Sequence, residues 1–297
     1  MVSAPSVSIA AVRARRVART QRLLRQGLTY FLCLFLGLAF MAPFFWAFFS
    51  ALKDPFEIFE FPPKLFPAVW RWDNFAEIWR RVPFAKWTGN TLFVCILSVL
   101  GQVSSATLVA YGFSRFRFPG REKLFILVLS TMMLPFQVTL IPLFLMYRQI
   151  GWLDTLKPLI VPNFFGGGAF YIFLIRQFLM SIPIDLDEAA KIDGANSFRI
   201  LVRIILPLSK PAILTVTIFS FMGQWNDFLG PLFFLNDPEK FTLSLGLRYF
   251  QGLPTSGEPL QHLLMAASIT MTVPMLVIFF FMQRYFVQGI VTTGLKM

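Results

Sequence analysis

The chain has 297 residues, of which 56% are hydrophobic and only 14% are charged, and it carries 37 phenylalanines. Because a soluble domain usually has about 25% charged residues, this composition excludes an ordinary soluble globular protein and favours a surface that faces lipid. A net charge of +12 would suggest nucleic-acid binding in a soluble protein, so its placement along the chain decides what it means.

The N-terminal arm, residues 1–27, is the first predicted unit. Six arginines crowd into it ahead of the first apolar run: Arg13, Arg15, Arg16, Arg19, Arg22 and Arg25. Such clustering is typical of a segment that stays in the cytoplasm, and it can also contact anionic lipid headgroups. No aromatic side chain that would stack on bases lies among these arginines, so we do not expect nucleic acid as a partner.

Six stretches are long and apolar enough to cross a membrane, which takes about 20 residues in a helix. The predicted spans are, approximately, residues 28–50, 89–113, 123–147, 158–180, 211–233 and 262–283. The first is longer than the apolar core of a cleaved signal peptide, which is about 7–15 residues, so we interpret it as an uncleaved anchor. The sequence therefore predicts an all-α integral membrane protein with one six-span domain over residues 28–297.

Charges outside the spans predict the orientation. With a cytoplasmic N-terminus, the inner segments are the arm, the turn near 114–122, residues 181–210 and the C-terminal tail, and they carry sixteen of the 27 Lys and Arg residues. The outer segments carry ten, interleaved with acids in the long outer loop 51–88. This asymmetry places both termini in the cytoplasm. Five tryptophans lie in the predicted outer loops or at their borders, as is typical of the interface: Trp70, Trp72, Trp79, Trp87 and Trp152.

Residue types that carry chemistry are sparse. The two cysteines, Cys33 and Cys95, lie inside apolar runs, and the single histidine is His262, so no metal site is predicted. The sequence contains no G-x-x-x-x-G-K-[ST] loop for nucleotide phosphates. Within the six spans the only acid is Asp227, which is weak support for an ion-driven carrier. We therefore expect neither an enzyme nor a chain that binds a cofactor of its own.

Two predicted spans carry a polar stripe along one helical face. The stripes are Thr91, Ser98, Gln102 and Ser105 in the second span, and Thr217, Ser220, Gln224 and Asp227 in the fifth. Two interpretations stay open: hydrogen bonds between packed helices, or the lining of a hydrated path for a polar solute. The run Gly166-Gly167-Gly168 in the fourth span is interpreted as a close helix approach or a local bend.

Residues 181–207, here called the hairpin, form a predicted helical hairpin between the fourth and fifth spans. Pro183 followed by Asp185, Asp187 and Glu188 favours a helix start, because proline fits the first turn and acids complement the positive end of the helix dipole. Gly194, directly after Asp193, is where a left-handed residue would end that helix.

The second helix of the hairpin is capped in this prediction by Asn196 or Ser197 and closes at Pro207. We expect the first helix to expose Ala189 and Ala190 beside Glu188, a low knob that fits a cleft in a cytoplasmic partner. From these residues alone, an ordinary connector lying at the membrane interface is the alternative.

The hairpin carries Glu188-Ala189-Ala190, Gly194 and Ile204-Ile205-Leu206-Pro207, and with this spacing it resembles the EAA signature of permease subunits of binding-protein-dependent ABC importers. The resemblance covers nearly the whole chain and is greatest to the maltose-type branch, which imports carbohydrates. The tail, Gly294-Leu295-Lys296-Met297, departs from the family's Gly-Ala-Val-Lys-Gly-like ending. Segments that carry the likeness are SALKDPFEIF, AYGFSRFRFPGR, TMMLPFQVTLIPLF, QWNDFLGPL and QRYFVQGI.

This resemblance implies a type I ABC importer permease fold in a bacterial-type cytoplasmic (inner) membrane, with the hairpin docking into a cytoplasmic ATPase. The implied coupling residues are Glu188, Ala189, Ala190, Asp193, Gly194, Leu206 and Pro207. The implied partners are an ATPase dimer that binds ATP and Mg, a second homologous permease and an extracytoplasmic sugar-binding protein.

Two other classes of function stay open on the residues alone: a self-sufficient secondary carrier or channel for a polar solute, and a membrane scaffold that transports nothing. The solute itself is left open among sugars, polyols and glycerol phosphates.

Overall fold

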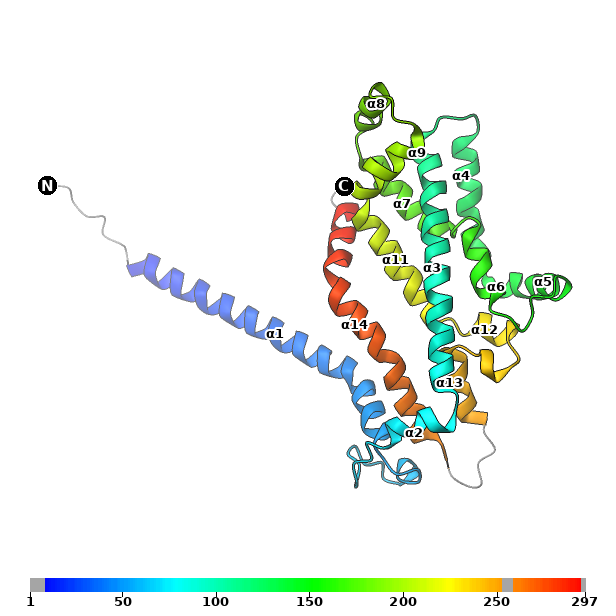
Figure 1. Ribbon diagram of the computed structural model, residues 1–297. Coiled ribbons are helices and arrows are strands. Elements are labelled where there is room, and N and C mark those ends of the chain that lie inside the picture. Colours follow the sequence, from blue (N-terminus) through cyan, green and yellow to red (C-terminus); the bar gives the residue numbers. More distant parts are fainter. Residues whose placement is uncertain (1–8, 253–258, 295–297) are drawn as a thin grey trace.

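The computed structural model describes residues 9–252 and 259–294, and every regular element in these ranges is a helix (Figure 1). The predicted all-α class is thereby confirmed for the described residues. Four helices in them are long and apolar enough to cross a membrane, or up to six if each of two bent pairs counts as one span.

The helix α1 (Ile9–Ala51) contains the whole of the predicted first span, 28–50. It meets α14 (Gln261–Gly294) at its C-terminal end and then projects away from the other helices (Figure 1). None of the residues in the most apolar 18-residue stretch of α1 is buried. Because so long a row of apolar side chains is not stable in water, α1 must be covered by lipid, by another protein or by both. The helix α14 in turn contains the predicted sixth span, 262–283.

The helix α3 (Phe84–Arg115) runs the length of the bundle and contains the predicted second span, 89–113. It packs against α7 (Ala169–Ser181) and α11 (Lys210–Trp225). We call the end of the bundle that carries the hairpin the hairpin end, and the opposite end, which carries residues 51–88, the loop end (Figure 1).

The predicted third span, 123–147, is wrong as one continuous helix. It consists of α4 (Arg121–Ser130), the 3-10 turn η2 (Thr131–Met133) and α5 (Phe136–Gln149), with a bend of 94° between the two halves. Pro135 explains the break, because the residue before a proline is pushed to extended backbone, and Leu134 there has ψ 113°.

The fourth predicted span lies within Lys157–Ser181, which is long and apolar enough to cross a membrane, although its helical form changes along its length. Residues 158–180 comprise α6 (Lys157–Ile160), η3 (Val161–Phe164) and, after the three glycines, α7. The fifth predicted span is interrupted. In the region 211–233 the helix α11 ends at Trp225, and the short α12 (Leu229–Phe234) follows. The predicted fifth span is therefore shorter as a helix than its apolar run.

The long loop 51–88 forms a cap at the loop end, built from η1 (Glu57–Phe59) and α2 (Asn74–Arg81). The buried side chain of Asn74 donates hydrogen bonds to the carbonyl oxygens of Ala51 at 2.9 Å and Lys53 at 3.0 Å. These bonds fasten the loop to the end of α1. The turn η5 (Pro238–Lys240) and the helix α13 (Leu243–Gly252) pack beside the loop end of α3.

Candidate functional site

The hairpin consists of α8 (Asp185–Ile192), α9 (Ser197–Ile200), the π-helical turn η4 (Leu201–Ile205) and α10 (Leu206–Leu208). The first helix ends as predicted, since Gly194 has a φ of +80°. The Gly194 N–H donates to the Lys191 carbonyl oxygen at 3.0 Å, and the Ala195 N–H donates to that of Ala190 at 2.9 Å. This is the Schellman arrangement, which requires a left-handed residue at the glycine.

The second half of the hairpin begins at a side-chain cap, also as predicted. The Asn196 side chain accepts a hydrogen bond from the Arg199 N–H at 2.8 Å, which satisfies one of the free donors at the start of a helix. Pro207 falls in the first turn of α10, where its missing N–H costs little.

The hairpin does not expose both alanines, so that part of the expectation is wrong. Ala190 is only 8% exposed and packs in a core with Ile200 and Ile205, which anchors α8 to the bundle. Glu188, Ala189, Asp193 and Gly194 are exposed. The reason is geometric, because adjacent helical residues point about 100° apart and cannot both face away from the core.

Large apolar side chains surround this exposed surface. Ile192 is 87% exposed and Phe198 is 70% exposed, while Pro207 is exposed and Leu206 is half-buried. An outward face that combines acids, small residues and exposed apolar side chains is typical of a contact surface for another protein.

A buried ion pair holds the hairpin to α3. The Arg115 Nε lies 3.4 Å from the Asp187 Oδ2, and the two side chains are only 5% and 3% exposed. The Arg115 guanidinium also donates to the Ile182 carbonyl oxygen at 3.1 Å, and the Tyr111 hydroxyl donates to that of Ser197 at 3.1 Å. The sequence predicts Asp187 only as a helix-start residue, and nothing local links it to Arg115, which lies 72 positions earlier in the chain.

A second buried arginine joins α7 to the start of α4. The Arg176 Nη2 lies 3.3 Å from the Glu122 Oε1, its Nε donates to the Phe113 carbonyl oxygen at 3.4 Å, and its guanidinium carbon lies 4.0 Å from the centroid of the Phe125 ring. The Nε and Nη2 atoms of this arginine thus have partners within the chain.

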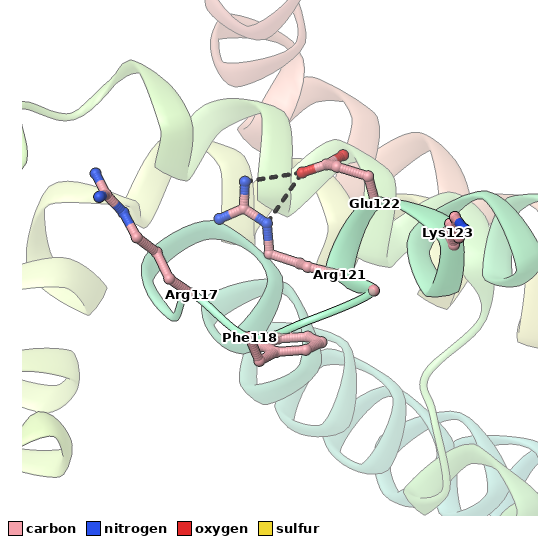
Figure 2. Close-up of a pocket in the computed structure, with 6 residues that line it drawn as sticks. Arg117, Phe118, Arg121, Glu122 and Lys123 are labelled. Carbon is pink, nitrogen blue, oxygen red and sulfur yellow. Dashed lines mark hydrogen bonds and ion pairs between the residues drawn. The ribbon is translucent and has the colours of Figure 1, made fainter.

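The turn between α3 and α4 forms a small open pocket, which Figure 2 shows with Arg121 paired to Glu122 at 2.8 Å. None of the residues predicted for the site lines it. The lining residues are Arg117, Phe118, Gly120, Arg121, Glu122 and Lys123.

The two predicted polar stripes meet about halfway along the bundle. The Ser220 Oγ donates to the Gln102 Oε1 at 2.5 Å. Asn163 of η3 lies between them: it accepts from the Ser105 Oγ at its carbonyl oxygen, at 3.0 Å, and from the Gln224 Nε2 at its side-chain oxygen, at 3.4 Å. We call these five residues the polar cluster; apart from Ser220, which is buried, they are partly exposed. Asn163 was not predicted, although it is a lone polar residue just ahead of the glycine run.

The glycine run lies directly against α3. All three glycines have positive φ values, and a Cβ on Gly167 would lie 2.5 Å from the Ala106 nitrogen and 2.5 Å from the Gln102 carbonyl oxygen. Both a close helix approach and a local bend are therefore confirmed at this run.

The other stripe residues lie apart from the polar cluster. Thr91 and Ser98 are buried; Thr91 accepts from the Leu243 N–H at 2.8 Å, and Ser98 donates to the Leu159 carbonyl oxygen at 3.0 Å. Thr217 donates to its own helix at the Ile213 carbonyl oxygen, at 2.8 Å. Asp227 lies beyond the end of α11 and accepts from the Gly230 N–H at 3.2 Å, so its placement in the helical stripe is wrong.

The described helices form a bundle with several candidate membrane spans and present the hairpin at one end. Residues 102–292 match the family described as binding-protein-dependent transport system inner membrane component, and the chain belongs to this family. It is therefore the inner-membrane component of such a transport system, and the predicted family membership is confirmed.

Relatives of known assignment agree with this family. The sn-glycerol-3-phosphate transport system permease protein UgpE of Yersinia pestis is 34% identical over 277 residues, which cover 90% of this chain and 97% of that protein. The maltodextrin transport system permease protein MdxG of Bacillus subtilis is 33% identical over 231 residues, covering 78% of this chain and 82% of that protein.

Two solved structures share the fold. A bacterial ABC transporter involved in the import of the acidic polysaccharide alginate aligns with a TM-score of 0.76 at 23% identity, covering 95% of this chain and 100% of that chain. A bacterial alginate ABC transporter in complex with an alginate pentasaccharide-bound periplasmic protein aligns with a TM-score of 0.66 at 20% identity, covering 88% and 94%. The fold is that of ABC importer permeases.

Proposed function

We propose that this chain is the permease subunit of an ATP-driven importer, forming half of the translocation pathway for a carbohydrate and coupling it to a cytoplasmic ATPase through the hairpin. The observation that carries the proposal is the outward face of the hairpin, where Glu188 and Ala189 lie exposed beside the bare side chain of Ile192. A surface of this kind, on a chain without a phosphate-binding loop of its own, fits a partner that supplies the ATP chemistry.

The proposed coupling residues are Glu188, Ala189, Asp193, Gly194 and Pro207, which are exposed, together with Ala190 and Leu206, which pack inward and hold their neighbours in place. ATP and Mg belong in this proposal to the ATPase dimer, and the permease binds no cofactor.

The proposed topology has six spans, with both termini and the hairpin in the cytoplasm. It treats α4 with α5 as one bent span, and α11 with the short α12 that follows it as the fifth span. In a chain lacking Cys33 and Cys95, a thiol introduced by Asp193→Cys should react with a membrane-impermeant reagent only in inverted vesicles. A thiol introduced by Glu60→Cys in the outer loop should react only in right-side-out cells.

A second permease completes the pathway in this proposal, and the helix α1 supports it, since none of its most apolar stretch is buried by the described residues. The polar cluster supplies this chain's half of the path, because Gln102, Asn163 and Gln224 are partly exposed although each takes part in a hydrogen bond. A sugar-binding protein delivers the solute at the loop end; one structural neighbour is a complex with its periplasmic protein.

A neutral carbohydrate is the proposed solute. Recognition of a phosphate group calls for a free arginine or lysine in the path, whereas Arg176 is already paired with Glu122 near the hairpin end. Because the relative from Yersinia pestis is a glycerol-3-phosphate permease, the solute panel must include sn-glycerol 3-phosphate beside maltodextrins, monosaccharides and polyols.

The test is purification of the complete complex, followed by reconstitution into liposomes with the binding protein. We expect an ATPase and a second permease to co-purify, and solute uptake to require ATP and the binding protein. The variant Glu188→Lys should insert normally and lose uptake, whereas Glu60→Lys, an exposed acid of the outer loop, should insert and transport normally. Uptake by this chain alone would instead identify a carrier or channel, and a stable complex that moves no solute would identify a scaffold.

A further inference from the structure

We propose that the buried Arg115–Asp187 ion pair is the joint that fixes the hairpin to α3, so that movement imposed on the hairpin by the ATPase reaches the polar cluster through α3. This inference rests on the proposed function and assigns positioning roles to Arg115, Asp187 and Tyr111. It concerns how the hairpin is connected, since Arg115 and Tyr111 lie outside the exposed surface that would meet the ATPase.

The burial of the pair makes this contact hard to break. The Arg115 and Asp187 side chains are 5% and 3% exposed, with Nε and Oδ2 3.4 Å apart. Separating two charges in such a place leaves each one desolvated and unpaired, which is among the costliest changes a protein interior can undergo. An exposed pair such as Lys64–Glu60 separates at little cost, because water replaces the partner. The hairpin therefore moves together with α3 as long as water is excluded from the Arg115–Asp187 ion pair.

Both halves of the hairpin are held by the same helix. Arg115 holds α8 through Asp187, while Tyr111, one turn earlier on α3, holds the start of α9 through the Ser197 carbonyl oxygen at 3.1 Å. The apolar core beneath the hairpin joins them, since Ala190 and Tyr111 belong to one buried cluster. Because both of these polar contacts are made to one helix, the hairpin has little freedom to tilt independently of α3.

The helix α3 leads directly to the polar cluster. It is one uninterrupted α-helix from Phe84 to Arg115, and Gln102 lies about 20 Å from Arg115 along its axis at 1.5 Å per residue. The covalent route from the hairpin to Ser220 instead passes an 80° bend between Ser197–Leu208 and Lys210–Trp225. A straight helix transmits a displacement along its length better than a bent connection, so α3 is a stiffer route than the connection into α11.

The experiment compares transport and ATP hydrolysis in the complete complex, reconstituted with its binding protein. In Arg115→Ala we expect the ATPase to co-purify as in the wild type and to hydrolyse ATP, while the solute imported per ATP falls at least about tenfold. The variant Asp187→Glu keeps a carboxylate within reach of Arg115, and we expect it to retain transport. Adding Asp187→Ala to Arg115→Ala should cost no more than Arg115→Ala alone, because the ion pair is already lost in the single variant.

The matched control is Arg117→Ala, an exposed arginine two residues further along the same turn, which should leave the ratio of transport to ATP hydrolysis unchanged. If Arg115→Ala fails to reach the membrane, the near-isosteric Asp187→Asn takes its place and is compared with Asp187→Glu. Tyr111→Phe, which removes only the hydroxyl that binds Ser197, should lower the ratio by a smaller factor, about threefold.

A wild-type transport ratio in Arg115→Ala would overturn the inference, and so would a defect in Asp187→Glu as large as that in Arg115→Ala. Loss of ATPase co-purification in Arg115→Ala also contradicts it, because the pair would then shape the docking surface rather than transmit its movement. A wild-type complex that hydrolyses ATP without importing any solute would refute the proposed function itself, whatever the variants do.

Discussion

The contact of Gly167 with α3 gives a sharp prediction, because the neighbouring Gly166 serves as its control. Both glycines have positive φ values, +59° and +96°. An alanine at either position therefore carries the strain of a left-handed backbone, about 1–2 kcal/mol. Only at Gly167 does the added Cβ meet another segment, at 2.5 Å from the Ala106 nitrogen and the Gln102 carbonyl oxygen, whereas Gly166 has open space within 4 Å.

The clash at Gly167 is with backbone atoms, which cannot rotate away as a side chain does. Overpacking of this kind costs about 1–3 kcal/mol or more, so Gly167→Ala should destabilise the protein by about 2–5 kcal/mol and Gly166→Ala by about 1–2 kcal/mol. Unfolding of the purified protein in mixed micelles with increasing SDS, followed by tryptophan fluorescence, measures the difference. Equal losses in the two variants would refute the close approach of the glycine run to α3.

Three further predictions concern the hairpin, the polar cluster and the loop end. Gly194→Val should weaken ATPase binding in a titrated pull-down by about 1–2 kcal/mol, since its φ is +80° in open space, whereas Gly194→Asn, which tolerates that φ, should bind nearly as the wild type does. Gln224→Leu removes the bond to Asn163 and should raise the KM for uptake; an unchanged KM and rate would mean that the cluster only packs helices. The Lys240 side chain, assisted by backbone N–H groups, lowers the pKa of Asp154 from 3.8 to about 2. The stabilisation from this carboxylate is therefore present above about pH 4 and is lost as the pH falls towards 2; a thermal-stability profile of Asp154→Asn should lack this step.

Features set by neighbouring residues were predictable from the sequence. Gly194 ends α8 with a left-handed backbone, and Asn196 caps the second half of the hairpin, because both effects act within one turn of helix. The apolar runs located the helices α1, α3 and α14 for the same reason, since length and hydropathy alone decide whether a helix can cross lipid.

Features set by packing between distant segments were not predictable. Whether Ala189 or Ala190 faces outward depends on where the core lies, and that core is assembled from α3, α7 and α11. No periodic pattern links Asn163 to Gln224 or Arg115 to Asp187, because each pair joins separate helices. The break in the third span did have a local signal in Pro135, but proline is tolerated inside other helices of the same chain, such as Pro142 in α5, so the residue alone did not decide it.

Gly167 and Arg115 both contact other parts of the protein through α3, but their loss should have different effects. Comparing them distinguishes an effect on protein stability from an effect on the coupling of ATP hydrolysis to transport. Gly167 lies directly against α3 at Gln102. A larger side chain there should therefore both displace the polar cluster and lower the stability of the protein. Arg115 lies at the C-terminal end of the same helix, where it contacts Asp187. Its loss should leave the packing around Gln102 intact but remove this contact between the hairpin and α3. Both Gly167→Ala and Arg115→Ala are therefore expected to lower solute transport while the ATPase still co-purifies. Only Arg115→Ala should leave the environment of the polar cluster as it is in the resting wild type. Labelling of a cysteine placed in the cluster measures this environment.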